Sequence, residues 1–438
     1  MFAVLLALTA VVTAQKTPPP VLVRAGRLLD VRSGAYRADQ GIWIEGGRIR
    51  QVGGFEAVRA AAPKDLVVID LGRAAVVPGL IDCHAHLLDA MDPTLSAQDN
   101  LVLTVTKDPP TKRALLGAAM AREMVDAGFT TVRNVGHSAI DGDMSLRDAI
   151  RAGWVPGPRI AASGRKIAPY GGQALRVQSG VAQALIDQEF LAVSSPDDGR
   201  RAVLENLRAG VDVIKVVADD WPRVMDEDTL KAIVDEAHRV GVRVAAHATT
   251  KLGIQAAIAA GVDSIEHGDD ATDAQFQAMR ARAIVLVPTL WPRDLLPISR
   301  ALSVRPDRDA LVDAYVAGER AKLDRARKAG VTIAFGSDMW FGYGDKTRGQ
   351  ATRLVLEALE TFGLPAAEVL KSATVHAADL LNMSDQVGAL EAGKYADLIA
   401  VDGDPLASLR ELEKVRFVMK DGAIIRDDRQ ATPGAVVR

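Results

Sequence analysis

The sequence predicts an α/β protein: a (β/α)8 barrel of the TIM type with a small β-sandwich domain formed from both ends of the chain. Short apolar strand candidates alternate with helical patterns through the middle of the chain, which is typical of a parallel sheet built from βα units. The two ends show β-rich runs and tight turns instead. The 438 residues are too many for one typical domain, but a barrel of about 200–250 residues and a smaller domain fit this length.

The chain begins with the apolar run MFAVLLALTAVVTAQ, which has the length of a signal-peptide core. The run ends in the small residues Thr13 and Ala14, although it has no Lys or Arg at its start. It is too short for a stable transmembrane helix. We therefore expect residues 1–20 to be a signal peptide and spacer and the protein to be periplasmic or secreted. If the run is not a signal, the protein is expected in the cytoplasm.

Residues 21–75 and 387–438 are expected to form the small β domain together. The first segment contains GIWIEGGRIRQVGG, and the second contains VRFVMKDGAIIRD. In each, a glycine-containing turn (EGGRI or KDGAI) separates two β-rich runs, which is the pattern of a hairpin.

Residues 76–386 are expected to form the barrel. Eight strand candidates follow one another here, beginning at residue 75: AVVPGLIDCH, FTTVRNVG, RIAASGR, VDVIKVVA, VRVAAHA, VDSIEHG, IVLVPTL and VTIAFGSD. Several of the helical segments between them end in a glycine directly before the next strand, as expected for a left-handed C-cap. The active site of such a barrel lies at the carboxyl ends of its strands, so residues at these ends are the candidates for function.

Polar side chains gather at these predicted strand ends. The candidates are His84, His86, Lys215, His247, His267 and Asp338. Four of the seven histidines belong to this set, a clustering that chance does not produce. Imidazole and carboxylate groups suit zinc and similar ions, and alternation along a strand puts His84 and His86 on the same side. The pattern predicts a metal site, and the alternative for His84 and His86 is a pair of core histidines bonded to backbone groups.

Lys215 is the unusual member of this set because it lies between Ile and Val in VDVIKVVA. A charged ammonium group is costly to bury in such surroundings. Either the lysine extends to solvent or pairs with an acid, or carbon dioxide carboxylates it and the resulting anion bridges two metals. Spacing alone leaves both interpretations open.

Five motifs resemble those of the metal-dependent amidohydrolase superfamily and occur in the same order: PGLIDCHAH, IKVVA, AAHA, SIEHG and GSD. Within that superfamily the chain is similar to the imidazolonepropionase-like branch, which includes prolidase-type dipeptidases and ochratoxin-degrading amidases. The resemblance covers nearly the whole mature chain, the split β domain included.

The resemblance implies two divalent metal ions, usually zinc. The implied ligands are His84, His86 and Asp338 for one metal, His247 and His267 for the other, and carboxylated Lys215 as the bridge. A hydroxide bridging the metals would be the nucleophile, because a zinc centre lowers the pKa of bound water to about 7. Asp338 would take the proton from this hydroxide and deliver it to the leaving nitrogen, acting as general base and then as general acid.

The implied reaction is hydrolysis of an amide or peptide C–N bond in a dipeptide or an N-acyl amino acid, aromatic acyl amides such as ochratoxin included. The alternative substrate class is a cyclic amide, a lactone or an ester. A deaminase and a metal-free scaffold protein are further alternatives, although a scaffold has no need of the full ligand set. The loop IKVVADDWPRVMDEDTL is shorter and more acidic than its counterpart in the dipeptidases, which argues against dipeptidase specificity.

Four residues beyond the ligand set are candidates for contact with substrate: His137 after the second strand, Tyr170 and Arg176 after the third, and Trp340 after the eighth. Each is equally compatible with a plain loop position. Cys83, the only cysteine, is one residue out of step with the two histidines of its strand and is expected to point away from the metals. A buried small side chain is the expected role of such a cysteine.

The composition restricts the partners of the protein. The formal net charge of -3 shows no electrostatic footprint for nucleic acid. A single cysteine excludes an intrachain disulfide and a Cys-rich zinc module. We expect a small-molecule substrate, no nucleic-acid partner and no stable membrane span. The family resemblance adds the expectation of a homo-oligomer.

Overall fold

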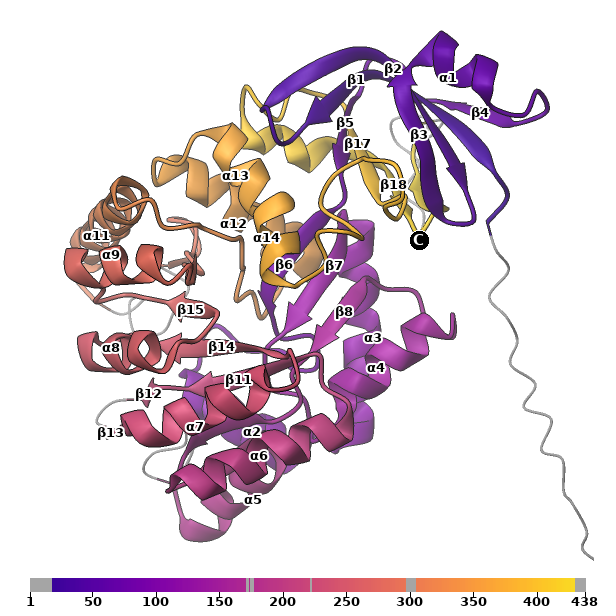
Figure 1. Cartoon of the computed structure of the whole chain (residues 1–438). Helices are drawn as coiled ribbons and strands as arrows, with labels where there is room; N and C mark the ends of the chain where they lie inside the picture. Colours follow the sequence, from indigo (N-terminus) through magenta and orange to yellow (C-terminus); the bar gives the residue numbers. More distant parts are fainter. Residues whose placement is uncertain (1–17, 171–172, 174–176, 221–222, 297–304, 430–438) are drawn as a thin grey trace, which may run out of the picture.

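The computed structural model describes residues 18–170, 173, 177–220, 223–296 and 305–429. Most of the predicted signal peptide and spacer, as well as Arg176, lie outside these residues. Figure 1 shows a sheet built from both chain ends, in indigo and yellow, at one end of a larger part with mixed helices and strands. Among the described helices, none combines the length and apolarity needed to cross a membrane.

The two chain ends form one sheet of eight strands in the order β19-β18-β17-β5-β1-β2-β3, with β4 paired to β1. Its strands are β1 (Val21–Asp30), β2 (Ala35–Glu45), β3 (Arg48–Gly54), β4 (Val67–Asp70), β5 (Ala75–Pro78), β17 (Leu398–Val401), β18 (Val415–Lys420) and β19 (Ala423–Asp427). Both predicted hairpins are confirmed, β2 with β3 and β18 with β19. The helix α1 (Phe55–Ala61) follows β3.

This end domain differs from the predicted sandwich because its strands form a single sheet. The long strand β1 pairs with β4 along its first residues and with β5 along its last. Between the two pairings the Gly26 amide donates a hydrogen bond of 3.0 Å to the Gly72 carbonyl. A Cβ atom at Gly26 would lie 2.1 Å from that oxygen, so only glycine permits the approach. β1 therefore pairs with both β4 and β5 on the same edge, and all three strands belong to one sheet.

The larger part contains two parallel sheets. The first consists of β6 (Leu80–Ala85), β7 (Phe129–Asn134) and β8 (Arg159–Ala162). The second, in spatial order, consists of β10 (Phe190–Val193), β9 (Lys166–Pro169), β11 (Val213–Val217), β14 (Arg243–Ala248), β15 (Ser264–His267) and β16 (Val285–Val287). A separate short ribbon pairs β12 (Asp219–Asp220) with β13 (Arg223–Val224).

The segment VTIAFGSD links the two parallel sheets on one side. The Leu286 amide of β16 donates to the Thr332 carbonyl at 2.9 Å, and the Cys83 amide of β6 donates to the Phe335 carbonyl at 2.9 Å. The segment forms an isolated bridge at Ile333 in place of the predicted eighth strand. The Phe335 amide donates to the Ser372 carbonyl at 3.0 Å, outside the parallel strands.

On the other side, β8 and the start of β11 are joined by a hydrogen bond of 2.8 Å from the Asp212 amide to the Ala162 carbonyl. The Asp212 carboxylate also accepts the Ala162 amide at 3.0 Å. The sheets thus contact one another on both sides, although the strand pairing assigns them as two sheets and not as one continuous eight-stranded ladder.

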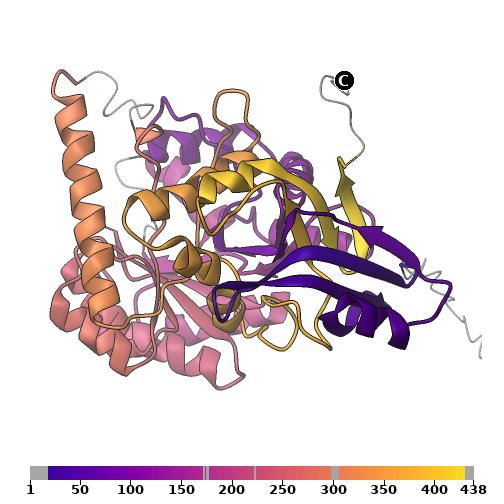
Figure 2. The same cartoon turned by 90° about the horizontal axis from the view of Figure 1, so that it is seen from above.

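Helices alternate with these strands and cover them. They are α2 (Ala97–Lys107), α3 (Pro110–Asp126), α4 (Gly142–Arg151), α5 (Ser179–Glu189), α6 (Pro196–Ala209), α7 (Glu227–His238), α8 (Lys251–Ala260), α9 (Asp273–Ala281), α11 (Arg308–Lys328), α12 (Arg348–Thr361), α13 (Ala366–Ser372) and α14 (Val375–Leu380). The predicted glycine C-caps are confirmed at Gly210 and Gly261, which end α6 and α8 with φ of 92° and 84°. Figure 2 shows the long helix α11 along the edge opposite the end sheet.

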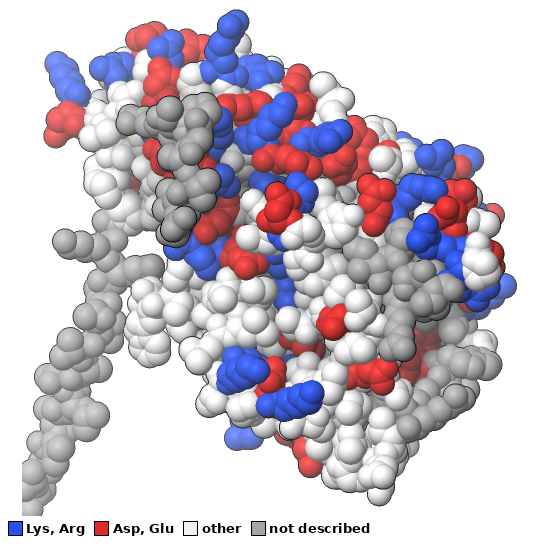
Figure 3. Space-filling model, turned by 180° about the vertical axis from the view of Figure 1, so that it is seen from behind, with Lys and Arg blue, Asp and Glu red and all other residues white. Residues whose placement is uncertain are grey.

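The main apolar core lies between these helices and the parallel strands, and a second core lies within the end sheet. On the face shown in Figure 3, Lys and Arg side chains are interspersed with Asp and Glu side chains. Many charged side chains of the protein form exposed ion pairs, such as Arg24 with Asp39 and Lys231 with Asp235.

Candidate metal centre

A cavity of about 350 Å³ opens at the carboxyl ends of the parallel strands. Its lining includes every residue of the predicted ligand set: His84, His86, Lys215, His247, His267 and Asp338. These residues are separated by up to 254 positions in the chain, and the convergence of β6, β11, β14, β15 and the segment after Phe335 brings them together.

Four histidine rings and one carboxylate form a compact group in this cavity. The Asp338 Oδ1 atom lies 3.2 Å from His86 Nε2 and 3.7 Å from His84 Nε2. The ring centroids of His84 and His267 are 5.2 Å apart, and those of His247 and His267 are 4.6 Å apart. One ligand atom from each of His84, His267 and Asp338 lies within 4.8 Å of the other two, a spacing at which they could hold a metal ion.

The Nδ1 atoms of three of these histidines contact fixed protein groups. The pairs are His84 with Glu266 Oε2 at 2.7 Å, His86 with the Gly136 carbonyl at 3.2 Å, and His267 with Thr289 Oγ1 at 2.7 Å. Metal-binding histidines almost always engage their second ring nitrogen in this way, because the contact fixes the ring and its tautomer. The Nε2 atoms of His84 and His86 turn toward Asp338, which distinguishes them from core histidines that are bonded only to the backbone.

The protonation states of the group favour cation binding. Burial lowers the pKa of His84 to about 4 and that of His267 to about 3. Burial alone would raise the pKa of Asp338, but the neighbouring His84 and His86 hold this pKa well below its usual range. Near neutral pH the group therefore presents uncharged imidazoles and an ionised carboxylate, which are the forms that bind metal ions.

Glu266 contacts His84 and is in turn bound by Arg133. The sequence analysis did not identify either residue. Glu266 is fully buried and accepts a hydrogen bond of 2.8 Å from Arg133 Nη2. Burial raises the pKa of Glu266, but Arg133 and His84 outweigh this effect and hold it well below its usual range. Glu266 stands directly before His267 in SIEHG, so its place in a ligand motif was the one available signal.

Backbone contacts lock Asp338 beside the first strand. The Asp338 amide donates to the His84 carbonyl at 2.8 Å. The Asp82 carboxylate accepts the amides of His84 and Ser337, both at 3.0 Å, and the Ser337 hydroxyl at 2.6 Å. His267 and Asp338 both have left-handed backbone conformations, with φ of 73° and 50°. Such conformations carry strain in non-glycine residues and often occur at functional sites.

Lys215 is 2% exposed, and its Nζ atom has no hydrogen-bond partner among the described residues. Burial lowers the pKa of this amine to about 8. The side chain therefore does not extend to solvent, which was one of the alternatives left open by the sequence. A buried polar group without a partner is costly, so this atom requires an explanation.

Of the other candidate residues, His137 and Trp340 line the cavity. Trp340 stacks on His86 with ring centroids 3.9 Å apart, and its Nε1 atom donates to Asp338 Oδ1 at 2.7 Å. Tyr170 does not line this cavity: the residue is 71% exposed, and its amide donates a hydrogen bond to the Val193 carbonyl.

Cys83 is fully buried among apolar residues near α14 and is absent from the cavity lining. Its Sγ atom lies 4.0 Å from the Ala377 carbonyl, and burial raises the pKa of the thiol well above its usual range. It therefore packs away from the ligand group, as its position in the strand predicts.

Lys166, at the start of β9, is a second buried lysine of the cavity that sequence reasoning missed. Its Nζ atom lies 2.9 Å from His137 Nε2 and 2.6 Å from Gln173 Oε1. It follows directly after the third predicted strand segment, RIAASGR, and that position was the only signal in the sequence.

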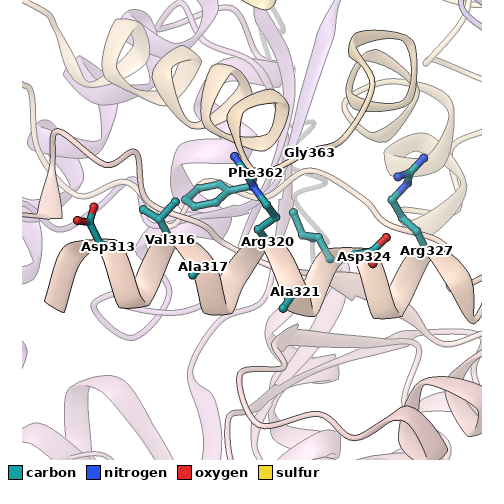
Figure 4. Close-up of a pocket in the computed structure, with 10 residues that line it drawn as sticks. Asp313, Val316, Ala317, Arg320, Ala321, Asp324, Arg327, Phe362 and Gly363 are labelled. Atoms are coloured by element: carbon teal, nitrogen blue, oxygen red, sulfur yellow. The ribbon is translucent and has the colours of Figure 1, made fainter. Parts of the chain in front are cut away.

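A larger hollow of about 560 Å³ lies on the outside, where α11 faces Phe362 and Gly363 (Figure 4). Its lining alternates small, apolar and charged side chains and includes no histidine. Chemistry, and not size, therefore assigns the candidate site to the smaller cavity.

Comparison with known proteins agrees with this site. The model of the amidohydrolase family matches residues 75–425. The chain belongs to the amidohydrolase family. The ochratoxinase of Aspergillus niger is 30% identical to this amidohydrolase over 389 residues, which cover 80% of this chain and 75% of that protein.

Solved structures of amidohydrolases agree with the whole architecture. A prolidase complexed with N-methylphosphonate-L-proline has a TM-score of 0.79 and 29% identity, covering 93% of this chain and 100% of that one. A Xaa-Pro dipeptidase with bound methionine has a TM-score of 0.77 and 30% identity over the same shares of the two chains. This amidohydrolase is therefore a hydrolytic enzyme that acts on C–N bonds.

Replacing Glu266 with glutamine is expected to weaken divalent metal binding by about 10- to 100-fold, the usual effect of losing a group that orients a metal-binding histidine. The amide lacks the charge that faces His84 Nδ1. Zinc affinity measured by competition with a chromophoric chelator checks this. Glu205→Gln, at an exposed ion pair with Arg165, is the control. Unchanged zinc affinity in a folded Glu266→Gln protein would contradict the orienting role.

Proposed function

We propose that this amidohydrolase binds two divalent metal ions, zinc by preference, and hydrolyses the amide bond of an N-acyl amino acid or dipeptide. The observation that carries the proposal is the group of neutral histidines around Asp338, together with the unpartnered amine of Lys215 in the same cavity. His84, His86 and Asp338 would hold one ion. His247 and His267 would hold the other.

The donor set fits this assignment. Borderline imidazole nitrogens and hard carboxylate oxygens are the ligands that zinc prefers in catalytic sites. Three of the histidines are oriented through Nδ1 by Glu266, Gly136 and Thr289. When bound, the metals would lower the pKa of water and polarise the scissile carbonyl.

We further propose that Lys215 is carboxylated. Its neutral amine would add to carbon dioxide, forming an N–C bond and losing one proton, and the product carries two oxygen donors. Burial favours this chemistry because it lowers the pKa of the amine to about 8, so a reactive neutral fraction exists near neutral pH. The modification would place two oxygen donors for metal ions next to a nitrogen that has no hydrogen-bond partner among the described residues.

Metal removal tests the role of Lys215. We expect chelation and dialysis in carbon dioxide-free buffer to abolish activity, and zinc with bicarbonate to restore it. Zinc alone in the same depleted buffer is expected to restore less than about a tenth of the activity, since a buried amine is a poor substitute for an anionic bridge. Full recovery without bicarbonate would contradict carboxylation of Lys215. It would not contradict the assignment of the histidines as metal ligands.

Asp338 is placed to move the proton of the reaction. Its Oδ1 atom accepts the hydrogen bond of Trp340 and lies beside His86. Its Oδ2 atom would take the proton of the attacking water and pass it to the leaving nitrogen. The low pKa of Asp338 keeps this oxygen ionised before the reaction.

The remaining cavity wall suits an apolar or aromatic acyl group. Its apolar members are Met91, Leu101, Val135, Trp291 and Trp340. The ochratoxinase, prolidase and Xaa-Pro dipeptidase relatives support amides with a neighbouring carboxylate as the substrate class.

We also infer that the two parallel sheets close into the predicted (β/α)8 barrel. The hydrogen bonds at Leu286, Cys83 and Asp212, which link the sheets on both sides, support this. The amidohydrolase relatives of similar architecture support it as well.

A substrate screen of the zinc-loaded enzyme tests the function. The panel contains aromatic acyl amides of phenylalanine, Xaa-Pro dipeptides, lactones and esters, and release of the free amino acid is measured by chromatography. We expect hydrolysis of at least one amide class with kcat/KM above that for every lactone. Hydrolysis of lactones without any amide would overturn the proposal.

Asp338→Asn is the catalytic control for this screen. Loss of the proton-transfer group is expected to lower kcat by about 10²- to 10⁴-fold. Metal analysis of the same preparation separates loss of catalysis from loss of metal. Turnover near that of the unmodified enzyme with metals bound would show that Asp338 is not the proton carrier.

A further inference from the structure

The geometry points to Lys166 as a residue that determines substrate specificity: its side chain binds an anionic group of the substrate inside the active-site cavity. This inference rests on the proposed function and names the chemical class of substrate that the cavity selects.

The position of the Lys166 side chain is fixed from three directions. It is 2% exposed and lines the same cavity as the candidate metal ligands. Its Nζ atom lies 2.9 Å from His137 Nε2, 2.6 Å from Gln173 Oε1 and 4.7 Å from the centre of the Phe190 ring. A lysine held in this way loses little freedom when a ligand arrives, which favours binding.

Both hydrogen-bond partners of Lys166 are uncharged. Gln173 contributes an amide oxygen, and burial together with Lys166 itself lowers the pKa of His137 well below its usual value. Among the ion pairs of the described residues, none includes Lys166. Burial lowers the pKa of Lys166 to about 8, so the ammonium form still predominates at neutral pH.

Glu189 and Asp89, two acids whose charges act on Lys166, have their closest contacts with other groups. The Glu189 carboxylate is paired with Arg113. The Asp89 carboxylate accepts the Thr104 hydroxyl at 2.9 Å and lies 3.4 Å from His137 Nδ1. Asp220, a further carboxylate of the cavity, lies 3.5 Å from Arg223. A buried charge without an ion-pair partner is costly, and a bound anionic ligand would give Lys166 such a partner.

The Lys166 ammonium has a donor available for such a ligand. An ammonium group carries three N–H donors, and His137 and Gln173 use two. The third remains for a carboxylate or another anion in the cavity that Lys166 lines.

The position of Lys166 relative to the metal ligands determines how far the anionic group of the substrate lies from the scissile bond. His137 separates Lys166 from the candidate metal centre: its ring lies 5.0 Å from that of His86 and 4.6 Å from that of Trp340. The cation is thus one side chain away from the metal ligands. A substrate whose anionic group lies close to its scissile amide, as in an N-acyl amino acid, spans this separation.

The test compares acid and amide forms of one substrate. The enzyme is assayed with an N-acyl phenylalanine and with the same compound carrying a neutral C-terminal carboxamide. We expect the unmodified enzyme to prefer the acid, and Lys166→Met to lower the acid-to-carboxamide ratio of kcat/KM about 100-fold, the order of effect for a charge-assisted hydrogen bond. The loss is expected mainly in KM.

Binding is measured separately from turnover. Calorimetric titration of the metal-loaded enzyme with 3-phenylpropanoate and 3-phenylpropanamide is expected to show a preference for the anion that Lys166→Met abolishes and Lys166→Arg keeps in part. Lys231→Met, at an exposed pair with Asp235, is the matched control and is expected to keep the preference. Metal content and thermal melting establish that each variant is folded and loaded.

The outcomes separate this inference from the proposed function. An unchanged acid preference in folded, metal-loaded Lys166→Met would overturn the role of Lys166, because a carboxylate held only by the metals keeps its affinity there. If the enzyme cleaves neither compound, the proposed function fails in this screen and the titration alone decides. Equal binding of 3-phenylpropanoate by the unmodified and Lys166→Met proteins would then refute the role of Lys166.

Discussion

The buried carboxylate of Asp82 joins the strand that carries His84 to the segment that carries Asp338. It accepts hydrogen bonds from His84 and Ser337, which are separated by 253 residues in the chain. Through these contacts the first ligand strand and the segment that carries Asp338 are hydrogen-bonded to one carboxylate. The positions of His86 and Trp340 relative to Asp338 depend on the same contacts, since both side chains meet its Oδ1 atom.

A second layer of polar groups determines what this unit binds. Glu266, held by Arg133, faces the Nδ1 atom of His84, and equivalent contacts orient His86 and His267. Burial keeps the imidazoles neutral, and the same burial lowers the pKa of Lys215 and that of Lys166 to about 8. The two lysines differ in their surroundings: Lys215 has no hydrogen-bond partner among the described residues, whereas Lys166 has two neutral ones. We therefore assign them different roles, one at the metals and one at the substrate.

The sequence was informative wherever function follows from position along a strand. His84 and His86 alternate with Cys83, so side-chain parity alone predicts that the histidines face the cavity and the cysteine faces the helices. The glycines that end α6 and α8 were likewise predictable, because a left-handed C-cap favours that residue.

Contacts between distant strands were not predictable from such local rules. The pairing of Glu266 with His84 and Arg133, and the approach of Lys166 to His137, arise only after folding. The single end sheet depends on the close passage of Gly26 and Gly72, which no periodicity records. Tyr170 illustrates the converse: a residue just after a strand end can still turn away from the site.

Anomalous X-ray diffraction from crystals of the zinc-loaded enzyme, collected at the zinc edge, tests the central claim most directly. We expect two zinc peaks in the cavity, one beside His84, His86 and Asp338 and one beside His247 and His267, with added density on the Lys215 nitrogen between them. Zinc bound only elsewhere on the protein, with this cavity free of metal at full occupancy of the other sites, would contradict it.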